Sequence, residues 1–190
     1  MHARSLTLVV ADLATLDAAI AGPEALSRAL GGCEVADGWE AFPEAVPAAR
    51  AALAADPASA RWGTRLFVLE EGRTLVGWGG FKGAPVDGAV ELGYAVAPAF
   101  RRRGIAAGAV RDMLQDAFSD HDVRAVIAHT LPEPGPSTGV LEATGFVHDG
   151  QVTDKRDGRL WRWRHERGQR ASPSTSNSLA GRPIRRIERS

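Results

Sequence analysis

The sequence has little of what marks a secreted or membrane-spanning protein. Its 190 residues hold one cysteine, Cys33, which excludes an internal disulfide framework and indicates a reducing compartment. No apolar run approaches the roughly 18 residues that span a bilayer. The start of the chain also lacks the apolar core and cleavage site of a signal peptide. We therefore expect a cytoplasmic protein that has no membrane partner.

Net charge is absent as well, because 23 Lys and Arg balance 23 Asp and Glu. No overall field therefore directs the chain toward nucleic acid, and we expect no such partner. The exception is the end of the chain. Residues 168–190 hold five arginines and one glutamate, a net charge of +4, so the rest of the chain has a net charge of −4. This Ser-, Pro- and Arg-rich tail has no periodicity, and we interpret it as disordered. RNA association through the tail is an alternative, although its charge is modest.

Two kinds of catalytic site are missing from the sequence. The five histidines show no metal-ligand spacing, so we expect no metal ion. There is no Gly-x-Ser-x-Gly motif, and no set of Ser, His and Asp has the spacing of a hydrolase. Metal-assisted and serine-dependent hydrolysis are therefore not expected.

The hydrophobic pattern of residues 4–167 predicts one α+β domain. Short β-branched runs between turns indicate strands, and apolar residues that recur every three or four positions indicate helices. The predicted order is a strand at 6–10, helices at 12–21, 23–30 and 43–56, a hairpin around 71–73, a strand at 89–97, a helix at 103–118, a strand at 124–131, a helix at 137–144 and two closing strands. This order predicts an antiparallel meander that leads into a strand–helix–strand crossover.

The most informative stretch is VAPAFRRRGIAAGAV, residues 96–110. It places Arg101, Arg102 and Arg103 at the start of a predicted helix, where unpaired N–H groups already carry partial positive charge. Cations are poorly placed there unless an anion is bound, so the pattern predicts a pyrophosphate site. Gly104 would let the backbone approach the ligand, and the small Ala106 would leave the first turn open. A solvated basic turn is the alternative interpretation.

Three segments resemble the GNAT superfamily of N-acetyltransferases. The run RRRGIA resembles the family signature [Q/R]-x-x-G-x-[G/A]. A second family segment is similar to HTLPEPGPSTGVLEATGF. The hairpin of the subgroup that acetylates ribosomal-protein N-termini is similar to WGGFKGAPVDGAVELGY. The resemblance covers residues 5–165. It implies an α/β/α sandwich with a mostly antiparallel mixed sheet, a V-shaped opening between strands 89–97 and 124–131, and helices on both faces.

The resemblance also implies acetyl-CoA as cosubstrate. The backbone of Tyr94, Ala95 and Val96 would pair with its pantetheine arm. Ser137 falls on the family's helix-opening serine, whose hydroxyl can protonate the leaving thiolate; capping of the helix is its alternative role. The pyrophosphate would lie against Arg101, Arg102, Arg103, Gly104, Ile105 and Ala106.

Acetyl transfer to an amine also needs a group that accepts the proton of the amine. Glu91 shares a strand face with the small residues Gly93 and Ala95, and its carboxylate could take this proton directly or through water. A solvent-facing glutamate without a role is equally open. His129, at the end of the next strand, is an alternative base or a polar strand terminus without a role. The only tyrosine, Tyr94, lies on the opposite face from Glu91 and is expected to pack in the core or against the cofactor, with protonation of the thiolate as its alternative role.

The candidate binding region for the acceptor amine is the loop that contains Trp39 and Phe42. In the family this region shapes the acceptor pocket, so both rings are expected to contact the substrate or to anchor the loop to the core. The acceptor would be the primary amine of a peptide N-terminus or of a small molecule such as an amino acid, polyamine or antibiotic. Gly135 and Gly139 depart from the family pattern, and a non-catalytic acyl-CoA-binding module is therefore a further alternative. A monomer or a homodimer is expected.

Overall fold

One mixed β-sheet organises the molecule. The computed structural model describes residues 5–169, and the structural statements below concern these residues. The strands follow the order β1-β3-β4-β5-β6-β8-β7, and β2 pairs with β4. Neighbouring strands are antiparallel except in the pairs β5–β6 and β2–β4. The strands are β1 Leu6–Val10, β2 Glu34–Val35, β3 Thr64–Leu69, β4 Thr74–Phe81, β5 Ala89–Val96, β6 Ala125–Thr130, β7 Val147–Asp154 and β8 Gly158–Glu166.

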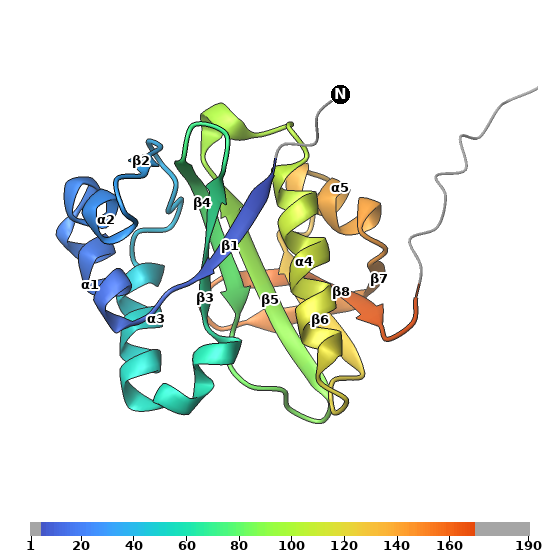
Figure 1. Cartoon of the computed structure of the whole chain (residues 1–190). Coiled ribbons are helices and arrows are strands. Elements are labelled where there is room, and N and C mark those ends of the chain that lie inside the picture. The colour runs from blue at the N-terminus through green and yellow to red at the C-terminus, as the bar shows by residue number, and fades with distance from the viewer. Residues whose placement is uncertain (1–4, 170–190) are drawn as a thin grey trace, which may run out of the picture.

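Helices cover both faces of this sheet. They are α1 Leu13–Ala21, α2 Pro23–Ala29, α3 Ala45–Ala55, α4 Ile105–Ser119 and α5 Pro136–Ala143. Figure 1 shows α1–α3 to one side of the sheet and α4 and α5 to the other. Asp12 caps α1 by accepting the N–H of Thr15 at 2.8 Å, and Pro23 occupies the first turn of α2. No helix between residues 5 and 169 is both long and apolar enough to cross a membrane.

The two faces of the sheet belong to two hydrophobic cores. Successive strand residues point to opposite faces, so Phe67 packs with α4 and α5, and its neighbour Leu66 packs with α1–α3. Both side chains are fully buried. Cys33 is buried in the second core, where it packs as a small apolar residue. On β8, Trp163 packs in the first core and Trp161 packs against it.

The feature that positions the site is the divergence of β5 and β6. The two strands pair over three residues only, from Ala89–Ala125 to Glu91–Ile127. Beyond Glu91, β5 continues to Val96 along β4, and β6 continues to Thr130 along β8. The V-shaped opening expected between these strands is therefore confirmed, as is the mixed sheet with helices on both faces.

Several local predictions need correction. The short strand β2 lies in the region predicted to be a loop, where it pairs with β4 over two residues. A 3-10 helix at Pro57–Trp62 follows α3 and was not predicted. The helix predicted to begin at Arg103 begins at Ile105, because Gly104 adopts a left-handed conformation with φ 77°. The predicted tail lies outside the described residues except for its first two, of which Gln169 donates a hydrogen bond to the Gly145 carbonyl at 2.9 Å.

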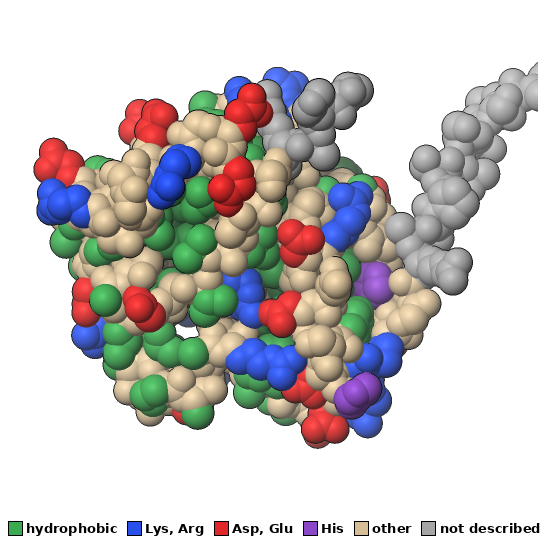
Figure 2. Space-filling model, in the orientation of Figure 1, with side chains coloured by type: hydrophobic (Ala, Val, Ile, Leu, Met, Phe, Trp, Pro, Cys, Tyr) green, Lys and Arg blue, Asp and Glu red, His purple; other side chains and the backbone are tan. Residues whose placement is uncertain are grey.

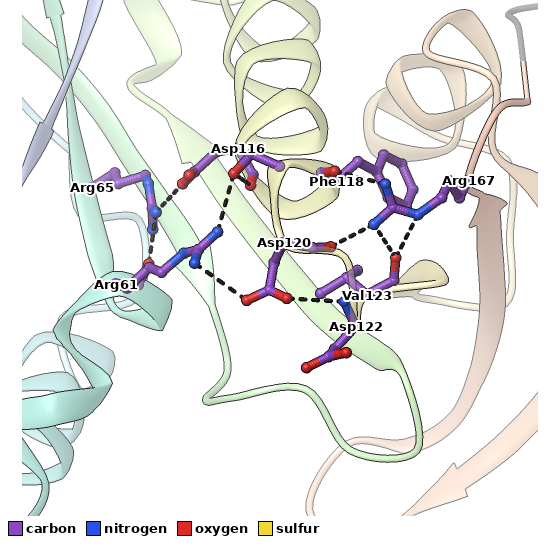
Figure 3. Close-up of polar contacts among 9 residues, drawn as sticks. Arg61, Arg65, Asp116, Phe118, Asp120, Asp122, Val123 and Arg167 are labelled. Atoms are coloured by element: carbon purple, nitrogen blue, oxygen red, sulfur yellow. Dashed lines mark hydrogen bonds and ion pairs between the residues drawn. The ribbon is translucent and has the colours of Figure 1, made fainter.

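A polar network links the strands to the end of α4 that lies away from the divergence. In Figure 3, Arg65 reaches Asp116, and Arg61 donates to Asp120 at 3.2 Å. On the other side Arg167 donates to the Val123 carbonyl at 2.9 Å through Nε and to the carbonyls of Phe118 and Asp120. Because these contacts hold the carboxyl-terminal part of α4, the orientation of its amino terminus toward β5 is supported from the far end.

Candidate active site

The backbone of β5 offers unpaired polar groups to the divergence. Lys82 N–H donates to the Glu91 carbonyl and Ala97 N–H to the Val76 carbonyl, each at 2.8 Å. In an antiparallel ladder alternate residues bond to the same neighbour, so odd-numbered residues of β5 bond to β4. Leu92, Tyr94 and Val96 therefore direct their N–H and C=O groups toward β6 and the opening. Leu92 borders the last paired step with β6, and the Val96 carbonyl accepts from Arg101 Nε at 3.1 Å, so Tyr94 and the Val96 N–H form the free part of the edge. This exposed edge can accept an extended ligand as an additional strand.

The loop between β5 and α4 turns this edge into the start of a helix. A 3-10 turn at Pro98–Phe100 is followed by Arg102 and Gly104, both in the left-handed region at φ 58° and 77°. Gly104 precedes α4 with no side-chain cap, so the N–H groups of the first helical turn point outward. A Cβ on Gly104 would meet no atom within 4 Å, and the requirement for glycine is therefore its backbone conformation.

The three arginines are exposed and do not converge on one point. Arg101 Nε donates to the Val96 carbonyl at 3.1 Å, and the Arg103 guanidinium lies 5.0 Å from the centre of the Phe100 ring. Arg102 is placed by its left-handed backbone. The predicted pyrophosphate site is thus a turn with outward N–H groups beside three basic side chains, which together favour an anion.

Tyr94 joins this edge to α5 from the side of the first core. Its hydroxyl donates to the Ser137 carbonyl at 3.1 Å, and burial raises the pKa of Tyr94 well above its usual value. Tyr94 lies on the face opposite to Glu91, as predicted, and holds its proton. Ser137 is the second residue of α5 and is exposed, so its predicted capping role is wrong. Thr138 takes part in the cap instead, because its hydroxyl accepts the N–H of Gly135 at 2.9 Å.

Glu91 belongs to a cluster of three titratable groups on the other face of the sheet. Its Oε1 lies 2.9 Å from His129 Nδ1 and also accepts from Lys82 Nζ. The exposed fractions of the Glu91 and His129 side chains are 23% and 17%. Burial opposes the charge of Glu91, but the hydrogen bonds from His129 and Lys82 outweigh it and lower the pKa of the carboxyl. Glu91 is therefore a paired, half-buried carboxylate and not a free surface residue.

The loop that contains Trp39 and Phe42 is anchored by aromatic residues. Trp39 is 7% exposed and packs with α1–α3, whereas Phe42 is 58% exposed. Trp78 on β4 donates its indole N–H to the Glu40 carbonyl at 2.6 Å, which holds the loop against the sheet. Trp39 thus serves as an anchor, and Phe42 is the ring that faces outward. Trp39 also lines a cavity of about 290 Å³ with residues of α1, α2 and α3, away from the divergence.

Sequence reasoning missed the pairing of Glu91 with His129, the part of Lys82 in it, and the anchor made by Trp78. The alternation of β6 could have placed His129 on one face with Ile127. The register of β6 against β5 was needed to bring that face beside Glu91. Among residues 5–169 no group of three or more His, Cys, Asp and Glu side chains could hold a metal ion. On the face that carries α4, acidic and basic side chains are interspersed (Figure 2).

Comparison with known proteins gives one consistent result. Residues 6–147 match the family model described as an acetyltransferase (GNAT) domain. A curated relative, the uncharacterized N-acetyltransferase YjdG of Bacillus subtilis strain 168, is 27% identical over 150 residues, which are 77% of this chain and 89% of that protein.

Solved structures share the fold at lower identity. Ribosomal-protein-S5-alanine acetyltransferase from Vibrio fischeri is 15% identical, with a TM-score of 0.60 over 87% of this chain and 95% of that chain. The spermidine/spermine N-acetyltransferase SpeG from Vibrio cholerae, solved in mutant forms, is 14% identical, with a TM-score of 0.58 over 85% and 95%. The acceptors in these two names differ, so the shared fold leaves the acceptor open.

Proposed function

Because the chain belongs to the GNAT family of acetyltransferases, which use acetyl-CoA, we propose that it acetylates a primary amine by direct attack within a ternary complex. The observation that carries this proposal is the divergence of β5 and β6. It leaves a strand edge unpaired and directs that edge toward the outward N–H groups at the start of α4. An extended thiol arm that ends in a pyrophosphate fits these two features together.

In this proposal the backbone from Tyr94 to Val96 pairs with the pantetheine arm. The pyrophosphate lies against the first turn of α4 and the preceding loop, with Arg101 released from the Val96 carbonyl to meet the phosphates. The loop residues that take part are Arg101, Arg102, Arg103, Gly104, Ile105 and Ala106. Gly135 and Gly139 leave open space beside α5, since a Cβ on either would meet no atom within 4 Å.

The reaction forms a bond between the amine nitrogen and the acetyl carbon and breaks the bond between that carbon and sulfur. The oxyanion would be stabilised by a gap-facing N–H of β5, at Tyr94 or Val96. The proton of the amine leaves toward the Glu91 side of the sheet, and the thiolate gains a proton from the exposed Ser137 hydroxyl. The Tyr94 hydroxyl already donates its proton to the Ser137 carbonyl at 3.1 Å.

We propose the α-amine of a protein or peptide as the acceptor, in line with the name of the Vibrio fischeri neighbour. A polyamine is the second candidate, in line with the spermidine/spermine neighbour. The acceptor loop carries acidic side chains and no basic ones between 33 and 44, which suits either cation. Phe42 is exposed and can contact the acceptor. Trp39 is buried, so an acceptor would contact this ring only by entering the cavity that Trp39 lines. We also propose a cytoplasmic location, which is consistent with the use of acetyl-CoA as cosubstrate.

Calorimetric titration of acetyl-CoA into the full chain tests the cosubstrate site. We expect micromolar binding by the wild type and at least tenfold weaker binding by the Arg101→Ala, Arg103→Ala variant, because two charge-assisted contacts to phosphate are lost. Release of free CoA is then followed with an alanine-initiated peptide and with spermidine. Binding without release of CoA from either acceptor would contradict the proposed transfer.

A further inference from the structure

His129 lies two residues beyond Ile127 on β6, on the side where β5 and β6 separate. The last paired residues of the two strands are Glu91 and Ile127. Continuing this register places His129 level with Gly93, one residue before Tyr94. Gly93 offers space at this level, since the only atom within 4 Å of an added Cβ is Lys82 Cε, at 3.8 Å. The imidazole therefore stands beside an open part of the strand, at the level where the gap-facing N–H groups begin.

The contact with Glu91 fixes which nitrogen of His129 is free. An ionised carboxylate only accepts hydrogen bonds, so His129 Nδ1 must donate across the 2.9 Å contact. In the neutral imidazole this leaves Nε2 unprotonated and able to accept a proton. Lys82 bonds to the same Glu91 oxygen and helps to keep the carboxylate charged. The arrangement is that of a base whose tautomer is held by a half-buried carboxylate.

Other charged groups also face His129. Arg162 is its direct partner on β8, and Arg164 is the partner of Ile127, so both lie on the same face of the sheet. Arg162 forms an ion pair with Asp149, with Nε 3.0 Å from Oδ2, and its Nη2 donates to the Asp149 carbonyl at 3.2 Å. Arg164 forms an ion pair with Glu166, with Nε 2.6 Å from Oε1. The charges of Glu91 and Lys82 oppose each other in the same way. His129 is thus surrounded by paired charges.

We propose that His129 is the general base of the acetyl transfer and that Glu91 is the residue that positions it. This inference rests on the proposed function. His129 Nε2 takes one proton from the acceptor ammonium, directly or through one water, and becomes imidazolium. The freed electron pair of the nitrogen attacks the acetyl carbon, and the C–S bond breaks with its electrons on sulfur. Glu91 stays ionised throughout and stabilises the imidazolium.

The first test is the pH dependence of kcat/KM for the full-length enzyme, with the alanine-initiated peptide and spermidine as acceptors. In His129→Gln we expect kcat/KM to fall by about 10²–10³-fold, the range typical of a lost general base, with the affinity for acetyl-CoA unchanged. The acidic limb of the wild-type pH profile should disappear. The matched control is His121→Gln, on an exposed turn before β6, which should keep both the rate and the limb.

The second test reads the tautomer without turnover. Nitrogen NMR of the wild type at pH 8 should show His129 protonated at Nδ1, with the signal assigned by its loss in His129→Gln. In Glu91→Gln the amide can also donate, and the Nε2-protonated form should increase. A wild-type His129 protonated at Nε2 would overturn the inference.

The two proposals fail in different ways. If the wild type transfers acetyl groups and His129→Gln keeps both its rate and its acidic limb, only the role of His129 is wrong. If the wild type binds acetyl-CoA but acetylates neither probe, the proposed function is overturned, and the role of His129 with it.

Discussion

The two parts of the site are built in opposite ways. The loop from Ala97 to Gly104 is one continuous segment, and what it presents is mainly backbone: outward N–H groups and a left-handed turn. The cluster of Glu91, His129 and Lys82 presents side chains from separate segments, with Glu91 and His129 38 residues apart in sequence. A site made of backbone groups is changed by substitutions that alter the backbone conformation. A site made of side chains is changed by substitutions that remove their functional groups. Substitutions in the two parts should therefore affect different quantities.

Glu91→Ala should produce the largest change. Removing the carboxylate leaves His129 without the group that holds its tautomer, and we expect kcat/KM to fall by about 100-fold or more. The Kd of acetyl-CoA should stay within about twofold, because the cofactor edge is made by backbone. Steady-state kinetics and calorimetry measure the two quantities. A Kd that rises in parallel with the loss of activity would show that the two parts are not separate.

Gly104→Ala should produce the next largest change, in the Kd of acetyl-CoA and not in kcat/KM. A left-handed φ costs an L-residue about 1–2 kcal/mol, so acetyl-CoA should bind about tenfold more weakly. Gly139→Ala is the matched control, since Gly139 lies inside α5 with open space around its Cα. Alanine there should stabilise the fold by about 0.5–1 kcal/mol in urea unfolding. If the two substitutions weakened acetyl-CoA binding equally, the left-handed conformation of Gly104 would not be the cause.

Lys82→Met should produce the smallest change. Lys82 is one of two groups that lower the pKa of Glu91, so its removal should move this pKa back toward 4.5. Because the folded-state pKa is lowered, the stabilisation by Glu91 is present above its unfolded pKa and is lost as pH falls through the folded one. The variant should lose this contribution at a slightly higher pH. Carbon NMR titration of the carboxyl measures the shift, and an unchanged or lower pKa would contradict the contact.

Much of the fold could be predicted from local pattern. Alternation along RLWRWRH predicts the strand in which Trp161 and Trp163 share a face, and Pro23 after Gly22 marks the start of α2. The turn before α4 was also predictable, since its arginines, glycine and helix are contiguous. Three features were not: the two-residue β2, the burial of Trp39 but not of Phe42, and the cap made by Thr138 in place of Ser137. Each depends on a neighbour or a helix boundary that short-range signals leave open.

The sequence by itself determined the order of the longer strands and helices, the glycine turn before α4 and the family signature, because each arises from residues close together along the chain. Only the tertiary structure decided that β5 and β6 separate after Glu91, and that His129 then meets this carboxylate. The physical reason is strand register. A shift of one residue would turn His129 to the opposite face, and register is set by the packing of the whole sheet.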